Sequence, residues 1–154
     1  MTSITKIFHF EMAHAIYDYP GACRNIHGHS YILHVSITNI EGVNGYFPGT
    51  GMIFDFKELK RIVNEAVLSK LDHQLVLSEK YVKMNNVSGM ENLFEMEAEP
   101  TAENLLRLIR KKLEPFFPGN MKLVKLLLYE TKDSYAEWIN TDMHMARDKK
   151  SVFR

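Results

Sequence analysis

The 154-residue chain has a single cysteine, no excess of either charge and no long apolar run. One cysteine cannot form a disulfide within the chain, so Cys23 indicates a reducing compartment and a role for the free thiol. Lysine plus arginine equals aspartate plus glutamate at 19 each. No overall positive field therefore recruits nucleic acid or an anionic membrane. The N-terminus lacks the apolar core of a signal peptide, and no segment approaches membrane-spanning length. We expect a small cytoplasmic protein.

What remains is the composition of an ordinary globular protein, with 45% hydrophobic and 25% charged residues. The length fits one domain over residues 1–154. Periodicity predicts strands over residues 3–14, 30–40 and 122–131, and helices over residues 55–71 and 101–113. Residues 78–99 show no period and are predicted to be a loop with a short insertion. The pattern indicates an α+β domain in which two helices cover one face of an antiparallel sheet.

Three histidines are candidates for a metal site. His27 and His29 flank Gly28 where a strand begins, and strand side chains two residues apart share a face. Two imidazoles on one face repel each other when protonated, and a bound cation holds both neutral. With His14 they would form a cup with an open fourth position, as in catalytic zinc sites. Spacing leaves one alternative open, namely ordinary turn and core histidines that bond to the backbone.

The sole thiol lies four residues before His27. Pro20, Gly21 and Arg24 give Cys23 a polar, turn-like setting, which argues against burial. Arg24 and a nearby cation would both favour the thiolate, a usable base or nucleophile. A thiolate is equally a zinc ligand, and as a fourth ligand Cys23 would make the site structural. Spacing does not decide between these two roles.

Acidic and hydroxyl side chains supply further candidates. Asp72 could orient His73 for acid/base work, although the pair could also simply end the first helix. Glu130 ends an apolar strand face, where it reaches solvent or, if buried, needs donors such as the two N–H groups of a heterocycle. Thr101 and Glu103 suit the start of the second helix and require no further role.

Six motifs nevertheless occur in one order. They are Phe10 through His14, Cys23-x3-His27-Gly28-His29, Gly51 through Phe56, Leu71-Asp72-His73, Pro100 through Asn104, and Glu130-Thr131. Together they resemble the 6-pyruvoyltetrahydropterin synthase family, over roughly residues 4–138. Within it, the short gap between Cys23 and His27 is more similar to the 6-carboxytetrahydropterin synthases of the queuosine pathway.

The resemblance implies the tunnelling fold, in which strands of several subunits form a barrel, commonly a hexamer of two trimers with active sites at subunit interfaces. It implies 7,8-dihydroneopterin triphosphate as substrate, with 6-carboxy-5,6,7,8-tetrahydropterin, acetaldehyde and triphosphate as products. The implied site residues are His14, His27 and His29 as Zn²⁺ ligands, Cys23 as catalytic thiol, Asp72 with His73 as the second acid/base pair, Glu130 as pterin anchor, and Thr101 and Glu103 beside the pterin.

Two alternatives belong to other classes. One is a sister enzyme, either a 6-pyruvoyltetrahydropterin synthase or an aldolase-like variant. The other is a non-catalytic, zinc-stapled binding module with Cys23 as fourth ligand. The chain also departs from the family. Glu11 and Met12 stand where small residues are usual, so we expect them to alter a pocket wall. Residues 139–154 fall outside the resemblance and are expected to be a C-terminal tail.

Overall fold

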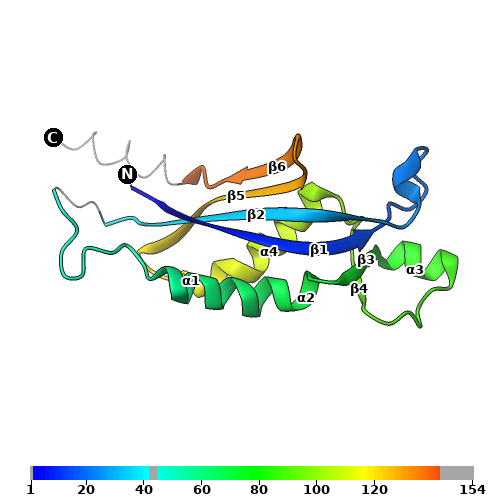
Figure 1. Ribbon diagram of the computed structural model, residues 1–154, viewed down its shortest axis with the longest axis horizontal. Helices are drawn as coiled ribbons and strands as arrows, with labels where there is room; N and C mark the ends of the chain where they lie inside the picture. Colours follow the sequence, from blue (N-terminus) through cyan, green and yellow to red (C-terminus); the bar gives the residue numbers. More distant parts are fainter. Residues whose placement is uncertain (1, 42–44, 143–154) are drawn as a thin grey trace.

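The computed structural model describes residues 2–41 and 45–142, which form a curled sheet with helices on one side (Figure 1). The strands lie in the order β4-β3-β1-β2-β5-β6. Their bounds are β1 Ile4–His14, β2 His27–Asn39, β3 Gln74–Ser78, β4 Leu93–Met96, β5 Met121–Thr131 and β6 Ser134–Ile139. β1, β2, β5 and β6 are antiparallel neighbours, whereas β3 and β4 join the end of β1 in parallel. The α+β class is confirmed, and the sheet is mixed rather than wholly antiparallel.

Both predicted helices form and cover the same face of the sheet (Figure 1). The first consists of α1 (Phe56–Val63), a π-helical turn (Asn64–Leu68) and α2 (Ser69–Leu71) in succession. The second is α4 (Ala102–Leu113). Each begins at the predicted cap, because the side chain of Asp55 accepts the Lys57 N–H at 2.7 Å and that of Thr101 accepts the Asn104 N–H at 3.4 Å.

The core lies between this helical layer and one face of the sheet. Strand alternation buries Phe8, Phe10 and Met12 of β1, while the residues between them stay exposed. Met12 therefore packs in the core, and Glu11 is exposed on the opposite face. Neither lines the cavity described below, so their effect on a pocket wall stays a prediction.

The segment 78–99 is more ordered than the sequence predicts. It contains the end of β3, helix α3 (Glu79–Asn85) and β4, so the prediction of a loop is wrong. Ser78 caps α3 by accepting the Tyr81 N–H at 3.0 Å. The prediction also stopped before β6, the edge strand that follows a tight turn after β5. Seven-, four- and six-residue elements are too short for hydrophobic periodicity to identify.

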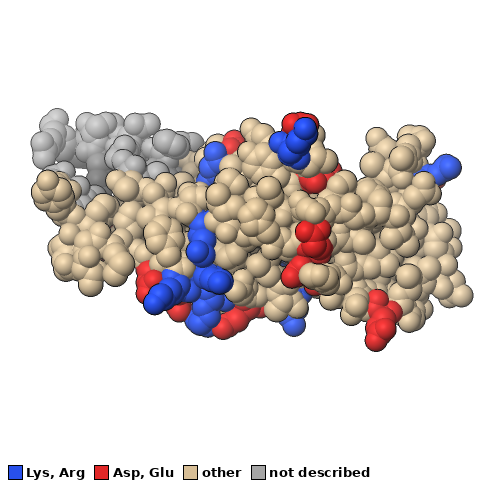
Figure 2. Space-filling model, viewed as in Figure 1, with Lys and Arg blue, Asp and Glu red and all other residues tan. Residues whose placement is uncertain are grey.

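The surface carries both signs of charge. Lysine, arginine and acidic side chains are interspersed on the face drawn in Figure 2, and no single sign covers it. Within the described ranges, no helix combines the length and apolar character needed to cross a bilayer.

Candidate functional site

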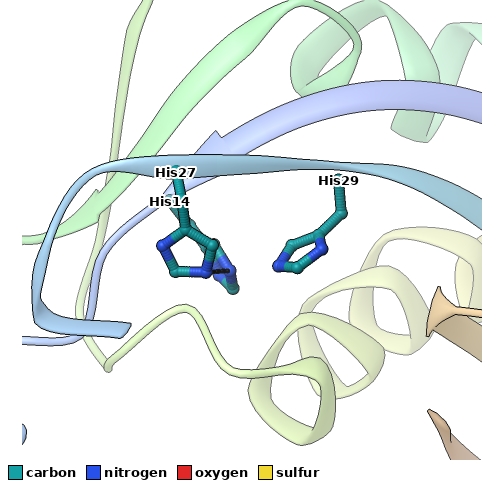
Figure 3. Close-up of side chains that lie close together, drawn as sticks. All are labelled: His14, His27 and His29. Carbon is teal, nitrogen blue, oxygen red and sulfur yellow. Dashed lines mark hydrogen bonds between the residues drawn. The ribbon is translucent and has the colours of Figure 1, made fainter. Parts of the chain in front are cut away.

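Three imidazoles meet where β1 ends and β2 begins. His14, the last residue of β1, is paired in register with His27, the first residue of β2, and His29 follows on the same face. Figure 3 shows the rings converging from these two strands. Each ring offers a nitrogen, and these three atoms lie within 4.8 Å of one another. The prediction that the three histidines come together is confirmed.

Hydrogen bonds to the backbone orient two of these rings. His14 Nδ1 lies 2.7 Å from the Pro100 carbonyl oxygen, and His27 Nδ1 lies 2.8 Å from that of Asn25. A carbonyl can only accept, so both Nδ1 atoms carry the proton and both Nε2 atoms can offer a lone pair. This is the usual outer arrangement around a metal-binding histidine.

The spacing of the lone pairs fits a metal ion. His14 Nε2 and His27 Nε2 are 3.1 Å apart, a separation at which two bare lone pairs repel and a cation between them relieves the repulsion. Tetrahedral zinc with Zn–N bonds of about 2.0–2.1 Å holds its ligand nitrogens about 3.4 Å apart. Burial, the largest cause, lowers the pKa of His14, whereas the bond to Pro100 and the charge of Glu130 oppose that shift. The three histidines thus form a group that could hold a metal.

A carboxylate stands at the rim of this cup. Glu130 Oε1 lies 3.4 Å from His14 Nε2 and 3.8 Å from His29 Nε2. It also accepts the hydroxyl of Tyr31 at 3.2 Å. Burial, and then the charge of Glu130, raise the pKa of Tyr31, so the hydroxyl keeps its proton and remains a donor. Tyr31 therefore fixes which oxygen of Glu130 faces the imidazoles.

A cavity of about 310 Å³ opens beside the cup. One wall comes from the loop after β1, a second from the start of α4, and the third from the sheet. The lining residues are His14, Ile16, Tyr19, Cys23, Thr101, Ala102, Glu103, Glu130, Ser134, Tyr135 and Ala136. The cavity therefore gathers most of the predicted site residues from three distant parts of the sequence, residues 14–23, 101–103 and 130–136.

Cys23 faces this cavity from a 3-10 turn, Ala22–Arg24. The residue is exposed, as its polar neighbours predict. Within the described part of the chain, the group of possible metal ligands consists of His14, His27 and His29 and does not include the thiol. The geometry gives Cys23 a place beside the cup rather than in it.

The predicted Asp72–His73 pair forms, but it lies outside this cavity. His73 Nδ1 lies 2.9 Å from Asp72 Oδ1, and the same oxygen accepts the backbone N–H of Glu11 at 3.0 Å. The His73 N–H donates to the Glu11 carbonyl at 2.6 Å, and His73 adopts a left-handed φ of 59°. Neither Asp72 nor His73 lines the cavity, and the His73 side chain is 76% exposed. Left-handed backbone at a residue other than glycine is uncommon and often marks a functional position.

Sequence patterns missed two residues that shape the site. Tyr31 shares a strand face with His27 and His29, so alternation could have identified it. Glu99 makes hydrogen bonds to residues 82 and 21 positions away, and no local pattern indicates such contacts.

Comparison with known proteins places this chain in a family. The sequence model of the 6-pyruvoyl tetrahydropterin synthase family matches residues 3–140 of this chain. The chain belongs to this family. Similar members include the 6-carboxy-5,6,7,8-tetrahydropterin synthase of Haemophilus influenzae, 29% identical over 143 residues that cover 90% of this chain and 99% of the relative. The enzyme of that name from Synechocystis is 31% identical over 140 residues, covering 91% and 95%.

Solved structures of the family agree in fold. The 6-pyruvoyl tetrahydropterin synthase of Caenorhabditis elegans superposes with a TM-score of 0.65 at 18% identity, covering 91% of this chain and 96% of that one. An uncharacterized Wolinella succinogenes protein gives a TM-score of 0.61 at 19% identity, covering 90% and 98%. The predicted family and the tunnelling-type fold of the subunit are confirmed.

Proposed function

We propose that the chain is a 6-carboxy-5,6,7,8-tetrahydropterin synthase of queuosine biosynthesis. It would convert 7,8-dihydroneopterin triphosphate and one water to 6-carboxytetrahydropterin, acetaldehyde and triphosphate in the cytoplasm. The observation that supports this best is one cavity that joins a three-histidine cup to an exposed thiol and a carboxylate. Relatives that bear this name align over most of the chain. We take residues 1–154 as one domain; of the expected tail, residues 139–154, residues 143–154 lie outside the described part of the chain.

Zn²⁺ is the proposed metal of the cup. His14, His27 and His29 would hold it through nitrogen, and the backbone carbonyls that fix two of the rings would keep them aimed at it. When bound, the ion supplies a Lewis acid at its open position, which polarises oxygens of the substrate side chain. The three ligands are neutral imidazoles, so the metal keeps its full positive charge.

Two proton carriers divide the remaining chemistry. The Cys23 thiolate, exposed at the cavity wall, would take a proton from the substrate carbon chain. The imidazole of His73, whose Nδ1 lies 2.9 Å from Asp72 Oδ1, would return a proton on the opposite face. Two proton carriers on opposite sides of one carbon chain suit an isomerisation followed by bond cleavage.

The pterin ring would bind through Glu130. One oxygen of this carboxylate is held by Tyr31, and the group lines the cavity. Such a carboxylate can accept paired N–H bonds from the pterin and fix the ring, so that binding energy goes into orientation. Thr101 and Glu103 line the same cavity at the start of α4 and would contact the ring from there.

The site is proposed to be completed by a second copy of the chain. Asp72 and His73 do not line the cavity of their own chain, so the imidazole would come from a neighbour. Among the described residues, β6 and the part of β1 before Met12, which β3 does not reach, each have an unpaired edge that supports such an assembly. Pairing of these edges would close a barrel, for which we propose a hexamer of two trimers.

A 6-pyruvoyltetrahydropterin synthase is the second candidate, because the family model and several structural neighbours carry that name. Product analysis distinguishes the two. Purified, zinc-loaded protein is incubated with 7,8-dihydroneopterin triphosphate, and the products are identified by mass. We expect 6-carboxytetrahydropterin with equimolar acetaldehyde. A pyruvoyl product without acetaldehyde would favour the sister enzyme.

A further inference from the structure

Glu99 is a charged residue near the cavity to which the proposed chemistry assigns no role. Its carboxylate faces backbone and hydroxyl donors rather than a cation. Oε2 accepts the Tyr17 N–H at 2.8 Å, and Oε1 accepts the Ser78 hydroxyl at 2.7 Å. Its carbonyl accepts the Thr101 N–H at 2.8 Å and the Asn104 side-chain amide at 2.9 Å. One residue thus connects the loop after β1, the end of β3 and the start of α4.

The first of these bonds holds the loop that carries the thiol. We call residues 15–26, between β1 and β2, the Cys23 loop. Tyr17 donates its N–H to Glu99, and the preceding amide, of Ile16, donates to the Cys23 carbonyl at 2.8 Å. Two consecutive amides therefore connect the Glu99 carboxylate to the backbone of the cysteine. Ile16, Tyr19 and Cys23 are the residues that this loop contributes to the cavity.

The bonds of the Glu99 backbone reach the opposite wall. They fix the turn into α4, from which Thr101 and Glu103 line the cavity. The next residue, Pro100, accepts the 2.7 Å bond from His14 Nδ1. Glu99 therefore lies at the point where the wall with the thiol, the wall at α4 and the histidine cup are joined.

We infer that Glu99 is a positioning residue for Cys23: its carboxylate holds the Cys23 loop at a fixed place relative to the histidine cup and the start of α4. Bonds from neutral donors to an ionised carboxylate are stronger than neutral pairs, so this contact suits a position that must be held closely. A displacement of about 1 Å at a reacting group can cost on the order of 100-fold in rate. The catalytic consequence rests on the proposed function, whereas the anchoring of the loop does not.

The anchoring is tested without turnover, on zinc-loaded protein. The variants are Glu99→Ala, the conservative Glu99→Gln, and Glu97→Ala as a matched control on an exposed glutamate. In Glu99→Ala, hydrogen exchange of the Tyr17 amide should rise about 10- to 100-fold. A nitroxide attached to Cys23, the single cysteine, should give the sharper spectrum of a more mobile label. Glu99→Gln, which keeps an acceptor oxygen, should restore most of both properties, and Glu97→Ala should match wild type.

Turnover then tests the positioning role. We expect Glu99→Ala to lower kcat about 10- to 100-fold with KM within about threefold, because Glu130 and the wall formed by the sheet stay in place. Zinc per chain should be unchanged. Unaltered exchange at Tyr17 and an unaltered label spectrum would overturn the anchor, whatever the enzyme does. Faster exchange with wild-type kcat would overturn the positioning role. If wild type itself has no turnover, the proposed function fails, and the exchange and label results still decide the anchor.

Discussion

The histidine cup and the Asp72–His73 pair are both held in a fixed arrangement, but by different parts of the structure. In the cup, His14 is buried and the three ligand atoms come from two strands whose register sets their spacing. In the pair, His73 is 76% exposed and depends on backbone bonds to one residue, Glu11. The cup is complete within one chain, whereas the pair is oriented but has nothing of its own chain's cavity to act on.

The histidine cup is already arranged within one chain, whereas the Asp72–His73 pair is proposed to join a site only when copies of the chain assemble. Adjacent strands can fix a metal site because their ladder determines where each side chain points. A proton carrier that must face the other side of a substrate cannot come from the same wall. If, as proposed, His73 acts in the site of a neighbouring copy, the reaction depends on oligomerisation. Four changes would break or sharpen this comparison.

The largest effect is expected from Cys23→Ala. Removal of the proposed base should lower turnover of dihydroneopterin triphosphate at least about 1,000-fold, whereas zinc per chain, measured by elemental analysis, should stay at the wild-type value. Ala22, the exposed neighbour in the same turn, provides the control as Ala22→Ser. Loss of zinc from Cys23→Ala would instead identify the thiol as a fourth ligand and the site as structural.

Zinc should stabilise the folded chain through the histidine cup, and the Asp72–His73 pair should not contribute to this effect. With free zinc at about 1,000 times its Kd, the wild-type chain should gain about 4 kcal/mol, on the order of 10 °C in Tm. His73→Ala should show the same rise, and His14→Ala should lose most of it. Calorimetry with and without zinc measures the shift. A rise that survives in His14→Ala would place the metal elsewhere.

Mixed oligomers should recover activity. Cys23→Ala and His73→Ala should each be inactive alone. If the cup and the His73 imidazole of one site come from different copies, co-expression should restore about a quarter of wild-type activity by random assortment. The matched control combines Cys23→Ala with His14→Ala. Those two residues line one cavity in one chain, so no recovery is expected. Equal recovery in both mixtures would contradict a site shared in this way.

The smallest effect is expected from Tyr31→Phe. The ring keeps its stacking on Phe10, and only the hydroxyl that holds Glu130 is lost. One such bond is worth about 1 kcal/mol, so kcat/KM should fall about 5- to 10-fold with zinc per chain unchanged. Tyr129→Phe, on the other face of the sheet, should be near wild type. An unchanged Tyr31→Phe would show that Glu130 needs no such support.

The sequence predicts the parts of the site that follow from local geometry. His27 and His29 share a face because strand side chains alternate, and Asp72 contacts His73 because the two residues end one helix. Long-range bonds are different. Glu99 reaches Tyr17 across 82 positions, and only the assembled sheet brings them together. The same limit applies to the fold: the long strands and helices are predicted, whereas α3, β4 and β6 are too short.

The left-handed backbone of His73 has a consequence for how this chain tolerates mutation. At φ 59° a side chain with a Cβ is held in a conformation that costs on the order of 1 kcal/mol, which glycine adopts freely. His73→Gly should therefore fold at least as stably as wild type while losing activity. A selection for abundance alone would enrich that substitution, and a selection for product would remove it. If His73 has the proposed role, selection for folding and selection for catalysis act in opposite directions at residue 73.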